Sequence, residues 1–338
     1  MNITAALLLI LLAGIVNGSF ALPTKHIKHW SFENIWLNYS YWSFLILPWL
    51  AIALLAPQVF SVYQSAPASI LWVMIIAGLG FGIGQICFAL ALKMIGFGLG
   101  FVINLGIAIG LGFSLPLIFQ HSDDIFTLFG LMTLIGSILA ILGLIFSTYA
   151  GHLHDRRSEK PSANEKHYFG GVLLAIIAGL FSAGQNFAFS YTVDMQHMAL
   201  TMHASTLGAS IIMWPGFLFF TFIPYFIYML YLHKKNNSWY QLRGRDKTKY
   251  YLFAIIMGLF WFGSLIFYSK AAQLIGDLGP VVGWPLFMVL IILTSNFWGW
   301  RYKEWEGSSA KVRNTLFLGI AFLILAILVL AYSSHLHS

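Results

Sequence analysis

Residues 78–112 decide the fold, and they read GLGFGIGQICFALALKMIGFGLGFVINLGIAIGLG. They form two apolar segments with ten glycines, and Lys93 is the single basic residue near the break between them. Glycines four residues apart clear one face of a helix, and such faces drive helix association in lipid, where apolar side chains gain nothing by leaving their solvent. The pairs are Gly78 and Gly82, Gly80 and Gly84, Gly96 and Gly100, and Gly106 and Gly110. We therefore expect two membrane helices that pack closely against others.

The composition of the whole chain is that of an integral membrane protein. Of its 338 residues 59% are hydrophobic and 9% are charged, whereas soluble domains carry about a quarter charged residues. Apolar runs of about 20 residues predict membrane-spanning helices. We predict an all-α protein with ten spans, at 3–23, 35–56, 69–92, 95–119, 125–149, 169–192, 204–231, 250–273, 278–299 and 312–333.

Two features of the apolar segments limit the other interpretations. A cleavable signal peptide normally opens with a basic region, and no basic residue precedes Lys25, so we interpret the first segment as a span. Cys87 is the only cysteine, and it therefore forms no disulfide within the chain.

The net charge of +7 is a topology signal and does not predict nucleic-acid binding. Cytoplasmic loops of membrane proteins hold the excess of Lys and Arg. Nearly all basic residues follow odd-numbered spans, so both chain ends are predicted to lie outside, on the periplasmic face of a cell inner membrane. They are Lys25, Lys28, Lys93, Arg156, Arg157, Lys160, Lys166, Lys234, Lys235, Arg243, Arg245, Lys247, Lys249, Arg301, Lys303, Lys311 and Arg313.

The two halves of the chain repeat each other. A shift of 180 residues lays Gly78-Leu79 on Gly258-Leu259 and Ile95-Gly96 on Ile275-Gly276. We predict a first five-helix repeat at 1–150, a cytoplasmic linker at 151–168 and a second repeat at 169–338. An odd number of spans per repeat inverts the second repeat, and inverted repeats are typical of secondary transporters, whose substrate sites lie near the midplane.

Other functional classes lack their sequence signatures. No glycine-rich loop followed by Lys-Ser or Lys-Thr occurs, so an ATP-driven pump is unsupported. His152 and His154 have no second cluster to complete a metal site, and we predict neither a metal nor another cofactor. The protein is not expected to be an enzyme, and its expected partners are a small solute, protons and membrane lipids.

Amide side chains inside spans are candidates for substrate binding, because buried polar groups are costly in a membrane. Asn17 lies late in the first span, and the matching part of the sixth span contains Gln185 and Asn186. Gln85 and Asn104 lie in the third and fourth spans. We predict that these five amides face the substrate, with hydrogen bonds between helices as the alternative.

Aromatic residues of the eighth and ninth spans are further candidates. Trp261, Ser264 and Tyr268 are spaced to share a helix face, and Trp284 follows in the ninth span. Aromatic rings with polar edges suit a sugar, which stacks one face on a ring and hydrogen-bonds through its hydroxyls. Ordinary packing or an interfacial belt is the alternative.

Coupling to protons would need titratable groups near the spans. Asp194, Lys270 and Asp277 are the candidates, together with Glu33 near the start of the second span. Lys270 and Asp277 could form a pair, although a long lysine side chain can also reach the interface by itself. Pro280 and Pro285 predict that the ninth span is interrupted early, next to Trp284.

One stretch carries a family resemblance. Residues 23–36, PTKHIKHWSFENIW, closely resemble the end of the first helix and the first loop of the L-rhamnose–proton symporter family, within the drug/metabolite transporter superfamily. The further matches are Gly82-Ile83-Gly84, Ser182-Ala183-Gly184, Gly258-Leu259 with Trp261, and Lys303-Glu304-Trp305.

The resemblance implies ten helices in two inverted five-helix repeats, and proton-driven uptake of a small polar solute such as L-rhamnose by alternating access. An exporter of metabolites or drugs from the same superfamily is the alternative. A membrane sensor or lipid-modifying enzyme would need a signalling domain or a cluster of catalytic residues, and neither is visible in the sequence.

Overall fold

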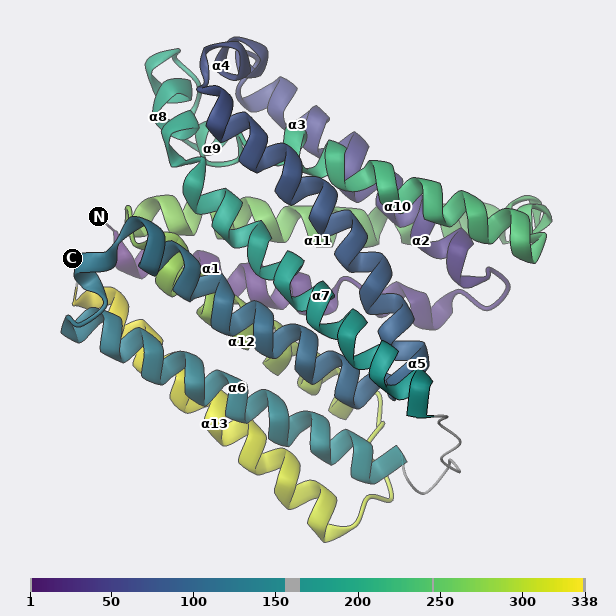
Figure 1. Cartoon of the computed structure of the whole chain (residues 1–338). Coiled ribbons are helices and arrows are strands. Elements are labelled where there is room, and N and C mark those ends of the chain that lie inside the picture. Colours follow the sequence, from purple (N-terminus) through teal and green to yellow (C-terminus); the bar gives the residue numbers. More distant parts are fainter. Residues whose placement is uncertain (1, 156–164, 245, 337–338) are drawn as a thin grey trace.

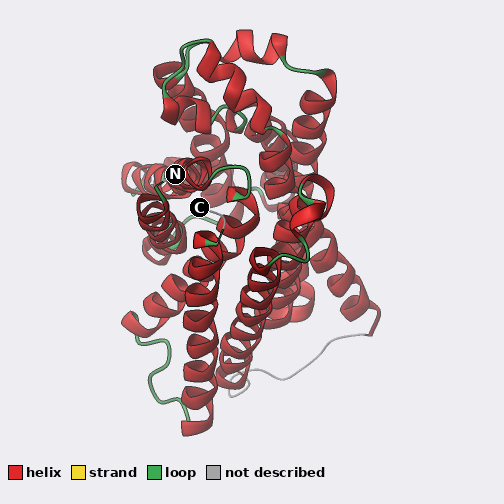
Figure 2. Cartoon of the chain, turned by 90° about the vertical axis from the view of Figure 1, so that its left-hand side faces the viewer, coloured by secondary structure: helices red, strands yellow, loops and turns green. Residues whose placement is uncertain are grey.

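The structure, a computed structural model, describes residues 2–155, 165–244 and 246–336. These residues form helices and connections and contain no strand (Figure 2). The α-helices are α1 Ile3–Ser19, α2 Phe32–Ser40, α3 Leu47–Leu55, α4 Val59–Ser65, α5 Ala68–Gln120, α6 Leu128–Asp155, α7 Glu165–Tyr191, α8 Val193–Thr201, α9 Thr206–Ser210, α10 Trp214–Asn236, α11 Lys247–Ile275, α12 Gly279–Arg301 and α13 Ala310–His335.

Ten segments of the described residues are long and apolar enough to span a membrane, and they match the ten predicted spans. The largest difference is at the seventh span, which was expected to begin at residue 204 and begins at Trp214. Ser205 instead caps the short helix α9, and Pro215 occupies the first turn of α10, where its missing N–H costs nothing. Residues 156–164 of the predicted linker lie outside the described part of the chain.

The bundle has two distinct ends. Figure 1 shows both chain ends at the left, near α8 and α9, and the connections α10–α11 and α12–α13 at the opposite side. We call the first the terminal end and the second the basic end, because the described loop lysines and arginines follow the spans that finish there. The charge pattern predicted this separation of the basic connections from the chain ends.

Two glycines 180 residues apart turn the chain between neighbouring spans. Gly96 has φ +82° and joins the two spans of α5, Ala68–Gly96 and Gly98–Gln120. Gly276 has φ +102° and ends α11 just before α12. Only glycine adopts such angles without strain, so the matched Ile95-Gly96 and Ile275-Gly276 dipeptides have the same structural role in both halves.

The glycine pairs of the third span are confirmed as packing faces. A Cβ at Gly82 would lie 2.3 Å from the carbonyl oxygen of Thr221 on α10, and Gly80 and Gly84 approach Phe181 on α7. The prediction was wrong for Gly106 in the fourth span, where an added Cβ would meet nothing within 4 Å. At Gly110 the Cβ would meet only the Ile141 side chain of α6, at 3.8 Å, which is ordinary contact and not close backbone packing.

The second span is a helix with a wide turn in its middle. Its π-helical segment η2, Tyr41–Ile46, lies between α2 and α3, and Pro48 stands just after it in the first turn of α3. Proline lacks the N–H that would continue the regular ladder and clashes with the carbonyl four residues earlier. A Cβ at Gly258 of α11 would lie 2.8 Å from the Cβ of Trp42 in η2, so α11 packs closely here.

The predicted interruption of the ninth span is wrong. α12 is helical from Gly279 to Arg301, with Pro280 in its first turn and Pro285 inside it. Pro280 is compatible with the helix because the N–H groups of a first turn have no partner within the helix. The chain is interrupted before α12, at Gly276, and not at Trp284.

The first helix of each half packs against helices of the other half. α1 packs against α11 and α12, and α7 packs against both spans of α5. α6 and α13 pair with each other, and large apolar side chains such as Leu131 and Leu325 remain exposed on them. This arrangement is consistent with the predicted inverted repeats and places the fifth and tenth spans at the periphery of the bundle.

Candidate functional site

Asn186 of α7 is the centre of a buried polar cluster. Its Nδ2 donates to the carbonyl oxygen of Gly112 on α5 at 2.8 Å and to that of Pro280 on α12 at 2.9 Å. Its Oδ1 accepts a hydrogen bond from the hydroxyl of Tyr268 on α11. Asn186 and Tyr268 are fully buried. One amide thus connects four helices where a polar group without partners would be costly.

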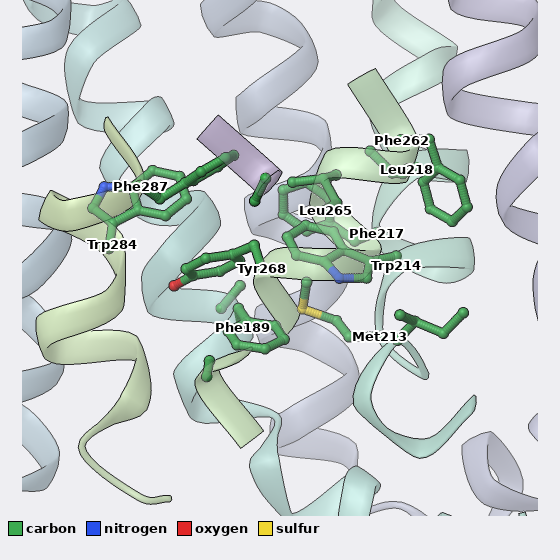
Figure 3. Packing of buried hydrophobic residues seen from close by; sticks show 14 of the residues in the cluster. Phe189, Met213, Trp214, Phe217, Leu218, Phe262, Leu265, Tyr268, Trp284 and Phe287 are labelled. Atoms are coloured by element: carbon green, nitrogen blue, oxygen red, sulfur yellow. The ribbon is translucent and has the colours of Figure 1, made fainter. Parts of the chain in front are cut away.

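Aromatic packing fixes the position of Tyr268. Its ring stacks on Phe287 with centroids 5.1 Å apart, meets Trp284 edge to face at 5.7 Å and lies 5.5 Å from Phe189. Figure 3 shows Tyr268 between Phe189 and Phe287, with Trp214 to its right. Offset and edge-to-face contacts of this kind stabilise aromatic pairs beyond their burial, so the hydroxyl is held in a defined direction.

Trp284 joins the same region from α12. Its Nε1 donates to the carbonyl oxygen of Ala108 at 2.9 Å, and a Cβ at Gly112 would lie 2.3 Å from that nitrogen. Gly112 therefore leaves the space that the indole occupies. The structure thus brings together three of the predicted residues: Asn186, Tyr268 and Trp284.

The other predicted amides surround this cluster without joining it. Asn17 of α1 donates to the Ser264 hydroxyl of α11 at 2.8 Å, and Asn104 accepts a long bond of 3.4 Å from Ser182 of α7. Gln185 is buried and Gln85 is half-buried. Within the described residues, the side chains of Gln85 and Gln185 show no hydrogen bond, so both amides retain free donors and acceptors.

Trp261 belongs to a different aromatic group. Its ring contacts Phe44 edge to face at 5.1 Å and Tyr39 at 6.3 Å, and it lies parallel to Phe81 at 6.5 Å. These partners come from the second and third spans, not from α7 or α12. The spacing that placed Trp261 on the face of Tyr268 did not place the two rings in one cluster.

Asp194 and Asp277 line a common cavity at the terminal end. Its volume is about 500 Å³, and a neighbouring cavity of about 180 Å³ shares Val193, His197 and Asp277 with it. We call the two cavities together the vestibule. Lys270 is not part of its lining, and its Nζ donates to Gln273 at 2.6 Å. No ion pair between Lys270 and Asp277 occurs in the described structure.

Some residues of the region could not be found by looking for polar side chains. The carbonyls of Gly112 and Pro280 become acceptors only because α5 and α12 cross α7 there. Ser190, one turn beyond Asn186 on α7, donates to Gln120 at 2.5 Å, and both line the vestibule. In the sequence, the signal available for Ser190 was its position four residues after Asn186, on the same helix face.

A second polar cluster joins the connections at the basic end, and we call it the clasp. Gln241 of the 3₁₀ turn η4, Ser238–Arg243, accepts from the backbone N–H of Ser31 at 2.6 Å and from Asn34 at 2.9 Å. Trp30 donates to the Gln241 carbonyl at 3.1 Å. Lys25 contacts both Glu304 and the ring of Tyr302. The α1–α2 connection is thereby tied to the α10–α11 and α12–α13 connections.

These features define a class of protein, a multi-pass membrane transporter. It has ten spans around buried amides, the vestibule at the terminal end and the clasp at the basic end. Residues 1–334 match the family of the L-rhamnose-proton symport protein (RhaT), and the chain belongs to this family.

Its relatives include L-rhamnose-proton symporters of Klebsiella pneumoniae, 30% identical over 324 residues, and of Citrobacter koseri, 29% identical over 324 residues, each comparison covering 91% of both chains. The symporter of Cronobacter sakazakii is 28% identical over 341 residues and 96% of both chains. These relatives favour symport over the exporter alternative.

Proposed function

We propose that this chain takes up L-rhamnose or a closely similar sugar together with protons, across the cell inner membrane. The observation that carries the proposal is the match of nearly the whole chain to the symport family. The buried cluster at Asn186 supports it, because that cluster supplies paired donors and acceptors next to aromatic rings.

We propose that the sugar binds at the buried cluster around Asn186. An amide presents both a donor and an acceptor, which is what a sugar hydroxyl needs, and Tyr268 and Trp284 offer ring edges and faces beside it. The free amides of Gln85 and Gln185 and the weakly bonded Asn104 are the groups best placed to gain a hydrogen bond from substrate. In this proposal Asn17 and Trp261 line the side of the sugar site that is nearer to the second span and α11.

Asp194 and Asp277 are the proton-binding groups in this proposal. Both are exposed in one cavity, where a carboxylate can exchange a proton with water and with an arriving substrate. Lys270 does not itself line the vestibule, and its Nζ donates to Gln273 of the smaller cavity, so we assign it a lesser role, in holding the end of α11.

Alternating access would move spans one to four of the first repeat, 1–150, against spans six to nine of the second repeat, 169–338, with the fifth and tenth spans peripheral. The clasp closes the basic end, and the vestibule opens at the terminal end. With the basic loops in the cytoplasm and both termini in the periplasm, this state faces outward and is ready to receive sugar. Release inside would require the clasp to open and the vestibule to close.

The experiment is uptake of labelled L-rhamnose into proteoliposomes that contain the purified chain, with and without an inward proton gradient. Accumulation above equilibrium that a protonophore abolishes is the expected result. A panel of other monosaccharides, measured in the same vesicles, defines the substrate. Equal sugar concentrations on both sides at every gradient would contradict proton coupling, and absence of sugar flux would contradict the whole proposal.

A further inference from the structure

The vestibule is not part of the Asn186 cluster, and its lining has a chemistry of its own. We propose that it is an outer sugar subsite, in which a monosaccharide binds before it reaches Asn186. This inference rests on the proposed function. It differs from the proton-binding role of Asp194 and Asp277, because it concerns where the sugar itself is held.

The size of the vestibule suits a small polar ligand. Its larger cavity has a volume of about 500 Å³, within the range of about 300–1,000 Å³ that is usual for small-molecule sites. The smaller cavity of about 180 Å³ continues from it along Val193, His197 and Asp277. A monosaccharide can therefore lie in the larger cavity with the smaller one ahead of it.

The lining offers what sugar hydroxyls require. Asp194 and Asp277 supply carboxylate oxygens as acceptors, and His197 and Gln120 can donate. The Oε1 of Gln120 accepts from Ser190, whereas its Nε2 is buried without a partner among the described residues. An unmade hydrogen bond of a buried amide costs about 1–3 kcal/mol, and a small turn of the amide toward a hydroxyl in the cavity would relieve this cost.

Phe189 separates the vestibule from the Asn186 cluster. It lines the smaller cavity together with Pro280, whose carbonyl is held by Asn186. Its buried ring stacks on Trp214 at 5.5 Å and contacts Tyr268 at 5.5 Å. A sugar in the vestibule is thus one side chain away from the central site, and the two sites are occupied in succession.

Thiol protection tests the subsite directly. Cys87 is the only cysteine, so Cys87→Ala gives a background without thiols. Ser69→Cys and, separately, Val193→Cys then place one thiol in the vestibule lining. Ser61→Cys on α4 is the matched control, because Ser61 is exposed near the same end and does not line the vestibule. The rate of reaction with a polar maleimide is measured on the full chain in nanodiscs, with and without L-rhamnose.

We expect L-rhamnose at about ten times its Kd to slow the reaction of both vestibule thiols about tenfold, because only the unoccupied fraction reacts. The reaction of the Ser61→Cys control should not change. The protection should persist when Tyr268→Phe is added, since that change alters the central site and not the vestibule. If both probe positions are protected, a local structural defect at one of them does not explain the protection.

Three results would overturn the subsite while leaving the proposed function intact. They are unprotected vestibule thiols in a protein that transports the sugar, equal protection of the Ser61→Cys control, and protection that disappears with Tyr268→Phe. The last would mean that the vestibule only closes in response to central binding. Absence of sugar uptake by the unmodified chain in proteoliposomes would instead reject the proposed function, and the subsite with it.

Discussion

The Tyr268 hydroxyl donates a hydrogen bond to Oδ1 of Asn186, and the Nδ2 of the same amide holds the carbonyls of Gly112 and Pro280. Both donor sites of the Asn186 amide are therefore used, and its oxygen accepts one hydrogen bond. A substrate oxygen that accepts from Asn186 must replace one of the two carbonyl contacts. Binding and a change in the packing of α5, α7, α11 and α12 are thus coupled at one side chain.

Tyr268→Phe should impair transport more than stability. It removes one hydroxyl but keeps the ring that packs on Phe287. Hydrogen bonds between membrane helices contribute on average about 0.6 kcal/mol, so we expect only a small fall in the unfolding temperature. Sugar uptake should fall about tenfold, the equivalent of about 1.4 kcal/mol. Tyr332→Phe, at an exposed tyrosine of α13, is the control, and equal uptake by both variants would contradict this role of Tyr268.

Gln241→Ala should loosen the clasp. The change removes the acceptor of the Ser31 N–H and one of the three acceptors of Asn34, and a buried donor without a partner costs about 1–3 kcal/mol. Hydrogen exchange should become faster in residues 27–35, as measured by mass spectrometry. Gln64→Ala on the exposed side of α4 should leave that segment unchanged. Unchanged protection in Gln241→Ala would show that the clasp does not hold the basic end closed.

Gly82→Ala and Gly106→Ala should differ in sign. A Cβ at Gly82 would lie 2.3 Å from the carbonyl oxygen of Thr221, so α5 and α10 would have to separate. At Gly106 the added methyl has open space, and alanine stabilises a helix by about 0.4–1 kcal/mol where it fits. Thermal unfolding in detergent should show a lower midpoint for the first variant and an equal or higher one for the second. A loss of stability in Gly106→Ala would contradict the packing described here.

Asp194→Asn and Asp277→Asn should uncouple sugar movement from protons. Neither asparagine can bind a proton at physiological pH, whereas its amide can still accept a hydrogen bond from a sugar. We expect accumulation driven by a proton gradient to be lost, while exchange of labelled for unlabelled sugar at equilibrium continues. Asp123→Asn, at an exposed carboxylate that does not line the vestibule, is the control. Gradient-driven accumulation by both vestibule variants would place proton binding elsewhere.

The sequence predicted the helices well because their length and polarity are local properties. The matched dipeptides Ile95-Gly96 and Ile275-Gly276 were found only as part of the repeat, and the structure shows that their glycines turn the chain with positive φ. The prolines at 280 and 285 led to a wrong prediction. Proline is compatible with the first turn of a helix, and inside a membrane helix it is tolerated because neighbouring groups satisfy the freed backbone carbonyl. Glycine spacing predicted packing at Gly82 and failed at Gly106, since spacing reveals a smooth face but not whether another helix covers it.

The site was predictable only in part for a similar reason. Asn186, Tyr268 and Trp284 stand out as polar groups inside apolar helices, and they do meet. Their partners include backbone carbonyls, which every residue has and which therefore leave no sign in the sequence. Trp261 shares a helix face with Tyr268 but contacts the second span. Two residues on one helix face can have different neighbours, because the helices that cross that face change along its length.

The most direct test of the central claim is proton entry caused by sugar. Proteoliposomes that contain the purified chain and an enclosed pH-sensitive dye are given L-rhamnose with no imposed gradient. Symport predicts that the interior becomes acidic as sugar enters, and that the signal disappears with Asp194→Asn and Asp277→Asn combined. Entry of labelled sugar into the same vesicles without any change in internal pH would contradict the account.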